Sequence, residues 1–287
     1  MPKVAVVTDS TACIPTKLVK EYNIRVVPLH FIFGEIKYTD SDHLPQDEFY
    51  RLLKDSPHSP TTSPASPGDY LEVFKELSSQ VQGVLCLTVT SKISGMFDAA
   101  RVAKETARET IPDVEIRVMD SGTAAMAQGF IALAAARIAQ RGASLPEACA
   151  VAERLKSKVN LIAIVDTLDY LAKSRRIPKV GAWAASLLGL KPILSFSNGA
   201  VKLLSAATNK PKAVERIIKI MEKRTAGQGD IHASIFHTNV LQEAEELKRR
   251  LEPQFPWAEL FISSFTPAMG IYTGPGVLGL VFYVEEG

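Results

Sequence analysis

The sequence predicts a two-domain α/β protein, and three observations support this prediction. The chain has 287 residues, which is more than one compact core normally uses and is typical of two domains. Apolar residues make up 46% of the chain and charged residues 22%, as in globular proteins that fold along their whole length. Between residues 68 and 141, β-rich runs alternate with helical patterns, which is typical of parallel βαβ units.

The first predicted domain covers residues 1–160 and begins with a β-branched run at residues 4–7. Residues 15–22 predict a short helix, residues 23–33 a strand-rich stretch, and residues 45–54 another helix. The run DSPHSPTTSPASPGDY then has four prolines among Ser and Thr. Proline lacks the N–H that a helix or central strand needs, so this run is predicted to be a long loop.

Regular alternation follows this predicted loop. The expected elements are helix 68–79, strand 83–87, helix 95–110, strand 114–119 and helix 124–141. Parallel strands joined by helices of this length imply right-handed crossovers. Ser144, with Glu147 three residues later, predicts a capping box that opens a further helix.

The second predicted domain, residues 161–287, has an α+β pattern. Its expected elements are a strand near 160–165, helical segments at 168–173 and 179–188, strands at 192–196 and 201–206, helix 210–225, strand 231–236, helix 241–251, and strands at 258–263 and 277–284. Asn198-Gly199 between two apolar runs is a strong signal for a two-residue hairpin.

Composition and charge exclude several classes of protein. Lys plus Arg (33) nearly balances Asp plus Glu (31), so no net field favours a nucleic acid, and no nucleic-acid partner is expected. No signal peptide or membrane span is predicted, since even the Ala-rich stretch 124–139 contains Gln128 and Arg137. The three widely spaced cysteines favour reduced thiols in a cytoplasm.

Polar residues follow three strands of the first predicted domain. Asp9 and Ser10 follow the first strand, residues 88–91 (TVTS) the second, and Asp120 and Ser121 the third. The carboxyl ends of parallel strands share one edge, where open α/β folds bind ligands. The alternative interpretation is that these residues only cap the helices that follow them.

Ser94 and Gly95 stand at the start of a predicted helix, whose backbone N–H groups and dipole favour an anion. The glycine-rich loops of nucleotide-binding proteins are absent, as are the Gly-x-Ser-x-Gly elbow and histidine spacings typical of metal sites. The sequence therefore predicts a binding site for an anionic group, with no catalytic residue, cofactor or metal.

Several motifs occur in a characteristic order: TDSTACIP at the start, TSPASP at 62–67, TSKISGM at 90–96, VMDS at 118–121, LDYL at 168–171, LGLKPI at 188–193 and TGPG at 273–276. In this order the chain resembles the DegV family over nearly its whole length. The resemblance implies a two-domain fold with a long-chain fatty acid buried between the domains. It also implies that a separate ATP-dependent kinase subunit phosphorylates the carboxylate that this chain presents.

By its motifs, the resemblance assigns the carboxylate contacts to Thr62, Ser63 and Ser94 of the first-domain loops. Asp9, Ser10, Asp120 and Ser121 would shape the rim less directly, and the other expected ligand-binding residues are Gly95, Tyr272 and Thr273. Arg176 is assigned to partner binding.

The chain departs from the pattern of the family at two positions. Tyr272 stands where a histidine is usual, so the headgroup would lose a pH-sensitive partner and keep a neutral donor. Arg175 stands where a glycine is usual, which affects the local turn before Arg176.

Two other functions remain as alternatives. The chain could be a stand-alone hydrolase of acyl esters or acyl phosphates that uses Ser66 or Ser94, or a binder of another apolar acid. The absence of a recognisable base near either serine disfavours the hydrolase. Acyl length, the identity of the kinase and the oligomeric state are not encoded in any motif.

Overall fold

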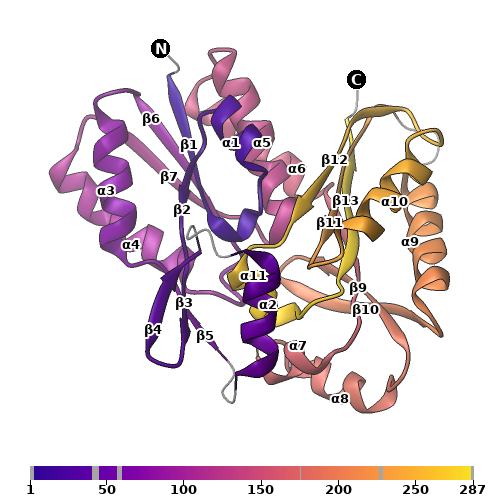
Figure 1. Ribbon diagram of the computed structural model, residues 1–287. Helices are drawn as coiled ribbons and strands as arrows, with labels where there is room; N and C mark the ends of the chain where they lie inside the picture. Colours follow the sequence, from indigo (N-terminus) through magenta and orange to yellow (C-terminus); the bar gives the residue numbers. More distant parts are fainter. Residues whose placement is uncertain (1–2, 41–44, 57–59, 175, 226–228, 286–287) are drawn as a thin grey trace. The chain divides into compact units, whose positions relative to one another are not determined.

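The computed structural model describes residues 3–40, 45–56, 60–174, 176–225 and 229–285 (Figure 1). The chain forms two compact units. The first comprises Met1–Asp42 and Thr61–Ser157, and the second His43–Pro60 and Lys158–Gly287. The domain limits expected from the sequence, 1–160 and 161–287, differ in the segment 43–60, which the structure groups with the second unit.

A four-stranded parallel sheet forms the centre of the first unit. Its order is β2 (Arg25–Val27), β1 (Val4–Asp9), β6 (Gly83–Thr88) and β7 (Glu115–Asp120). Thr8 pairs with Leu87, and Thr88 with Asp120, so the three strand ends align along one edge. The parallel sheet confirms the fold class predicted for this part.

Helices cover both faces of this sheet, as Figure 1 shows. On one side lie α3 (Pro67–Ser78) and α4 (Met96–Thr110), and on the other α5 (Ala125–Gln140) and α6 (Leu145–Lys156). The short elements η1 (Ser10–Ala12) and α1 (Thr16–Glu21) follow β1. The capping box of α6 is confirmed, because the N–H of Ser144 donates to Glu147 at 2.7 Å.

A second, three-stranded antiparallel sheet of the first unit has the order β4 (Ile36–Thr39), β3 (His30–Phe33), β5 (Thr61–Ser63). The prediction of a continuous loop was therefore wrong at residues 61–63. Prolines 60 and 64 flank β5 without interrupting it, and β5 is an edge strand, where proline is tolerated. Strand β4 was also missed by the sequence analysis.

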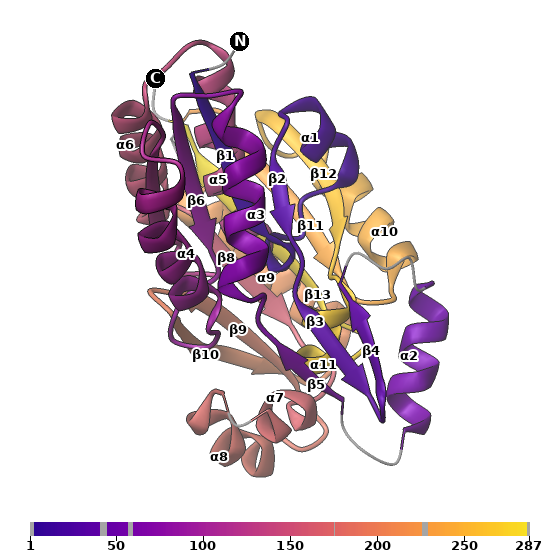
Figure 2. The ribbon, with the colours of Figure 1, turned by 90° about the vertical axis from the view of Figure 1, so that its left-hand side faces the viewer.

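The second unit contains a six-stranded mixed sheet, visible in Figure 2. Its order is β10 (Ala200–Ala207), β9 (Lys191–Ser197), β8 (Asn160–Ile164), β13 (Leu278–Val284), β11 (Ile231–His237) and β12 (Trp257–Ser264). Only β11 and β12 run parallel; the other pairs are antiparallel. The predicted hairpin is confirmed, with both Asn198 (φ 51°) and Gly199 (φ 69°) in the left-handed region that its turn needs.

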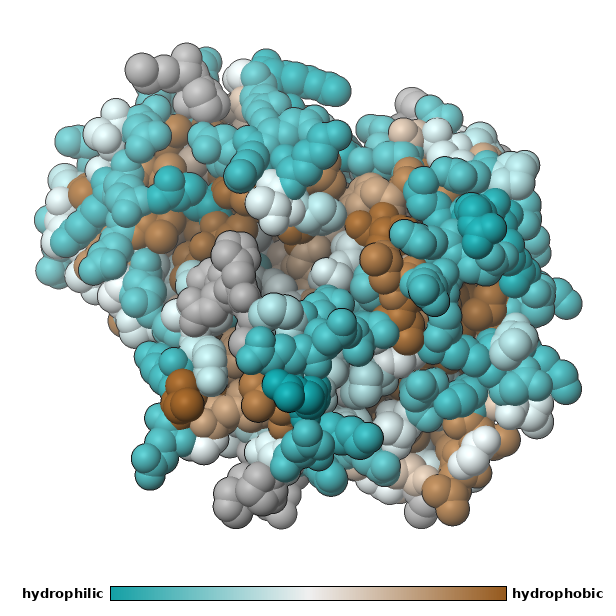
Figure 3. Space-filling view, viewed as in Figure 1, coloured by the Kyte–Doolittle hydropathy of each residue, from teal (hydrophilic) through white to brown (hydrophobic). Residues whose placement is uncertain are grey.

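Six helices of the second unit lie in its described part: α2 (Gln46–Asp55), α7 (Asp169–Lys173), α8 (Pro178–Ser186), α9 (Lys210–Thr225), α10 (Leu241–Leu251) and α11 (Pro267–Thr273). Helices α9 and α10 bury one side in the core, which includes Ile217, Met221 and Leu247. Hydrophilic side chains cover the outer side of α10 (Figure 3). None of the helices in the described ranges is both long and apolar enough to cross a bilayer.

Candidate functional site

Asp9 ties together the ends of the first two central strands. Its side chain is fully buried, with Oδ1 accepting from the N–H of Thr11 (3.1 Å) and Oδ2 from the N–H of Val89 (2.8 Å). Burial raises the pKa of the Asp9 carboxyl, and hydrogen bonds from Thr11, Val89 and Gln128 offset part of this rise. Asp9 therefore shapes the edge of the sheet from inside.

Ser10 also acts on a neighbouring segment. Its hydroxyl accepts a hydrogen bond from the N–H of Leu29 at 3.1 Å, just before β3 begins. This bond links the end of β1 to the three-stranded sheet that carries Thr62 and Ser63.

Asp120 holds the loop that precedes α4. Its Oδ2 accepts from the N–H (3.0 Å) and the hydroxyl (2.7 Å) of Ser91, while Oδ1 accepts from the N–H of Gly122 (2.7 Å). The N–H of Ser121 donates to the carbonyl of Thr88 at 3.0 Å. The sequence analysis placed these residues on one edge, and their hydrogen bonds join the loops after β6 and β7.

The segment around Thr62 meets the start of α4. A Cβ built on Gly95 would lie 3.4 Å from Cγ of Pro64, and the N–H of Ala65 points to Sδ of Met96 at 3.1 Å. The Ser94 hydroxyl accepts from the N–H of Met96 at 3.4 Å. Two motifs that are distant in the sequence are thus neighbours at the amino end of a 15-residue helix.

Thr62 and Ser63 face opposite sides of β5. Thr62 pairs with Phe31 and Ser63 pairs with His30. Successive side chains of a strand point to opposite faces, and directly paired residues share a face. The structure therefore brings both residues to the site but presents their hydroxyls in different directions.

His30 is a polar residue beside this site to which the sequence analysis gave no role. It shares the face of Ser63, and its Nε2 lies 3.9 Å from Oδ2 of Asp69. Its buried Nδ1 has no hydrogen-bond partner among the residues that the structure describes. A lone histidine in a sequence carries no such signal, because the pairing of β3 with β5 decides what lies next to it.

In the second unit, Tyr272 and Arg176 are in direct contact. The guanidinium carbon of Arg176 lies 4.1 Å from the centroid of the Tyr272 ring, a cation–π arrangement. Thr273 ends α11, and its hydroxyl donates to the carbonyl of Met269 at 3.1 Å. Arg175, the second departure from the family pattern, lies outside the described residues.

The glycines after Thr273 fit a crowded turn. A Cβ on Gly274 would lie 2.3 Å from Cδ2 of Tyr170, and one on Gly276 would lie 2.1 Å from Oδ2 of Asp166. Asp166 pairs with Lys191 at 2.9 Å. The motif is therefore held against α7 on one side and against an ion pair on the other.

The two candidate nucleophiles have structural hydrogen bonds. The hydroxyl of Ser66 accepts from the N–H of Asp69 (3.2 Å) in the capping box of α3, and that of Ser94 accepts from Met96. Within the described part of the chain, neither hydroxyl is bonded to a base. The same part contains no cluster of three side chains that could hold a metal ion.

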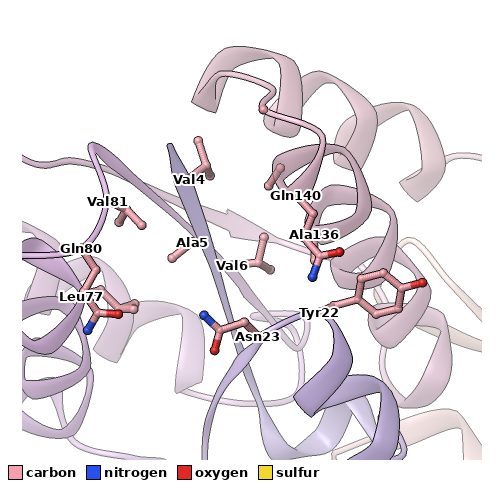
Figure 4. A pocket seen from close by; sticks show the side chains of 12 residues that line it. Val4, Ala5, Val6, Tyr22, Asn23, Leu77, Gln80, Val81, Ala136 and Gln140 are labelled. Carbon is pink, nitrogen blue, oxygen red and sulfur yellow. The ribbon is translucent and has the colours of Figure 1, made fainter. Parts of the chain in front are cut away.

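The first unit also contains a cavity of about 570 Å³ at the amino end of β1 (Figure 4). Val4, Val6, Leu77 and Ala136 form apolar parts of its wall, and its polar side chains are uncharged, such as those of Gln80, Gln140, Asn23 and Tyr22. It contains none of the predicted site residues. With no cation in its lining, this cavity is poorly suited to a carboxylate headgroup.

Comparison with known proteins identifies the family. The model described as "Uncharacterised protein, DegV family" matches residues 3–285. The chain belongs to the DegV family. A DegV domain-containing protein of Halalkalibacterium halodurans is 31% identical over 287 residues, covering 100% of both chains.

Solved structures of DegV proteins have the same fold. A structure described as fatty acid binding of a DegV family protein from Thermus thermophilus has a TM-score of 0.91 and 28% identity, covering 99% of this chain and 100% of the other. A stearic acid-binding protein from Eubacterium ventriosum has a TM-score of 0.87 and 26% identity, with 99% and 98% coverage. The resemblance to DegV drawn from the motifs is thus confirmed, together with the fold class.

Proposed function

We propose that this DegV protein binds a long-chain fatty acid and presents its carboxylate to a separate ATP-dependent kinase subunit. The contact between Gly95 and Pro64 carries the proposal, because it brings Ser94 and the Thr62-Ser63 pair to the amino end of α4. Backbone N–H groups and the helix dipole favour an anion there. The fatty acids bound by the Thermus thermophilus and Eubacterium ventriosum proteins support the same ligand class.

Within this proposal the site residues have different tasks. The hydroxyls of Thr62 and Ser94 contact the carboxylate, and Ser63 adjoins them from the other face of β5. Gly95 gives the carboxylate access to the helix terminus, and Tyr272 and Thr273 contribute from the second unit. Asp9, Ser10, Asp120 and Ser121 fix the loops, in keeping with hydrogen bonds that join those loops to one another. Arg176 serves the kinase partner.

The sizes of the interaction energies show which part of the ligand determines affinity and which part determines orientation. On the order of a dozen buried methylenes at ~0.8 kcal/mol each stabilise the complex by roughly 10 kcal/mol. One hydrogen bond to a charged group contributes about 1.5 to 3 kcal/mol. The acyl chain therefore determines most of the affinity, and the hydroxyl groups orient the carboxylate.

The proposed reaction leaves all the chemistry of ATP to the kinase. A carboxylate oxygen forms a new bond to the γ-phosphorus, the bond from that phosphorus to the bridging oxygen of ADP breaks, and acyl phosphate and ADP result. This chain holds the acceptor in a fixed orientation, which lowers the entropic cost of the transfer.

The first test is organic extraction of the gently purified protein, followed by mass spectrometry of the lipid. We expect a long-chain fatty acid, and we expect calorimetry with the emptied protein to detect binding of palmitate. Absence of both would refute the binding function.

The second test addresses the partner. The loaded protein is incubated with ATP, with and without a bacterial fatty acid kinase subunit, and acyl phosphate is trapped with hydroxylamine. We expect hydroxamate only when the kinase is present. Hydroxamate without the kinase would make this chain an enzyme, and release of free acid from added acyl phosphate would favour the hydrolase.

A further inference from the structure

We propose that Tyr272 is a positioning residue whose ring face holds the Arg176 guanidinium in the orientation that phosphoryl transfer requires. This inference rests on the proposed function and describes how two residues of the site act together. It gives the ring of Tyr272 a task separate from that of its hydroxyl.

The packing of two short helices brings the pair together. Tyr272 lies in α11, one residue before its end, and Arg176 lies in the segment between α7 and α8. The close approach of Gly274 to Tyr170 joins the end of α11 to α7, since only a residue without a Cβ leaves that ring its place. Tyr272 and Arg176 are both half-buried.

The stacked geometry suits the task of an anion-binding arginine. The guanidinium carbon is 4.1 Å from the ring centroid, well inside the range of a cation–π interaction. A guanidinium is planar and directs its N–H donors outward in its own plane, which matches a phosphate group. A ring against its face restricts the rotamers of this long side chain while leaving the direction of those donors unchanged.

Charge alone does not explain the contact. Lys173 and Lys179 lie on the adjoining helices with exposed side chains, so cations are already present around Arg176. What Tyr272 adds is a π face, which phenylalanine also has and leucine lacks. The ring and the hydroxyl can therefore be separated by substitution.

The experiment compares Tyr272→Phe, Tyr272→Leu and Arg176→Lys with the wild type. Tyr22→Leu is the matched control, because Arg137 lies over the Tyr22 ring at 5.3 Å in the first unit, away from the site residues. Palmitate affinity and the rate of acyl phosphate formation with the kinase are measured for each variant. The chemical shift of the Arg176 Nε–H group in labelled protein is measured for the wild type and for the variants that keep Arg176.

We expect Tyr272→Leu to lower the transfer rate about three- to tenfold below that of Tyr272→Phe, and Arg176→Lys to lower it by a similar factor below that of the wild type, the range of a cation–π contact. Palmitate affinity stays unchanged in Arg176→Lys and in Tyr22→Leu. The ring-current shift of Arg176 persists in Tyr272→Phe and is lost in Tyr272→Leu.

Equal losses of transfer rate in Tyr272→Phe and Tyr272→Leu would assign the effect to the hydroxyl and overturn the proposal. An Arg176 shift that is unchanged in Tyr272→Leu would overturn it as well. If the wild type binds no fatty acid, the proposed function fails, whereas the Arg176 shift still reports whether the ring holds the guanidinium.

Discussion

Nδ1 of His232 lies 2.7 Å from Oε1 of Glu259, and its Nε2 lies 3.0 Å from Oε2 of Glu285. The imidazole also stacks on the Tyr283 ring at 4.5 Å. Burial by itself lowers the pKa of His232, but the hydrogen bonds and charges of the two glutamates outweigh it, so the pKa lies above the ordinary value. These two contacts with glutamates link β11 to β12 and to Glu285, which directly follows β13.

A raised pKa gives a stability contribution that is complete below the ordinary imidazole value of about 6.5 and is lost as the pH rises through the folded-state value. We expect His232→Gln to lower the free energy of unfolding by about 1 to 2 kcal/mol at pH 5.5 and by less at pH 8.5. Urea unfolding at both pH values measures this. Burial lowers the pKa of His237, so this residue makes the free energy of unfolding change with pH in the opposite direction. The test therefore compares, at each pH, the difference in the free energy of unfolding between the wild type and His232→Gln. A difference that grows with pH would contradict the prediction.

Thr62→Ala and Ser94→Ala test the headgroup. Each removes one donor to a charged carboxylate, so the free energy of palmitate binding should weaken by about 1.5 to 3 kcal/mol. The rate of acyl phosphate formation should fall by a larger factor, because the orientation of the carboxylate is also lost. Calorimetry with palmitate and with hexadecanol, which has no carboxylate, separates headgroup effects from acyl-chain effects. Ser144→Ala, which alters a capping serine of α6, is the control. An unchanged rate of acyl phosphate formation in a variant that carries both substitutions would show that Thr62 and Ser94 have only a structural role.

Asp9→Asn should lower the free energy of unfolding by about 3 kcal/mol. Both carboxylate oxygens of Asp9 accept from backbone N–H groups, whereas an asparagine offers only one oxygen and turns its NH₂ toward the other donor. Asp120→Asn is the matched control, because that side chain has the same kind of bonds but is only half-buried. We expect it to lose about 1 kcal/mol in denaturant unfolding. Equal losses for the two variants would show that burial is not the cause.

Gly276→Ala tests the turn beside Tyr272. Gly276 (φ +88°) has no room for a Cβ because of Asp166, whereas Gly142 (φ +90°) has nothing within 4 Å of that position. Gly142→Ala should therefore cost about 1 kcal/mol for the backbone alone. Gly276→Ala should cost at least ~1 kcal/mol more, because it displaces the partner of Lys191. Thermal unfolding of the two variants provides the comparison, and equal shifts in Tm would exclude a steric contribution.

The sequence alone determined the alternating strands and helices of the first unit, the capping box at Ser144 and the hairpin at Asn198-Gly199. Each of these depends on local properties: hydrophobic periodicity, a hydrogen bond three residues away, or a positive φ at a short turn. The ordered motifs also gave the family. Local signals of this kind depend on neighbouring residues and not on the rest of the chain.

Tertiary structure decided the features that depend on distant partners. Strand β5 has three residues and exists through its pairing with β3, so a proline-rich stretch gave no sign of it. The same pairing sets Thr62 and Ser63 on opposite faces and puts His30 beside Ser63. The inward bonds of Asp9 and the stack of Arg176 on Tyr272 likewise join residues that no periodicity relates. Side-chain contacts between such segments follow from packing in three dimensions, which the order of the residues does not display.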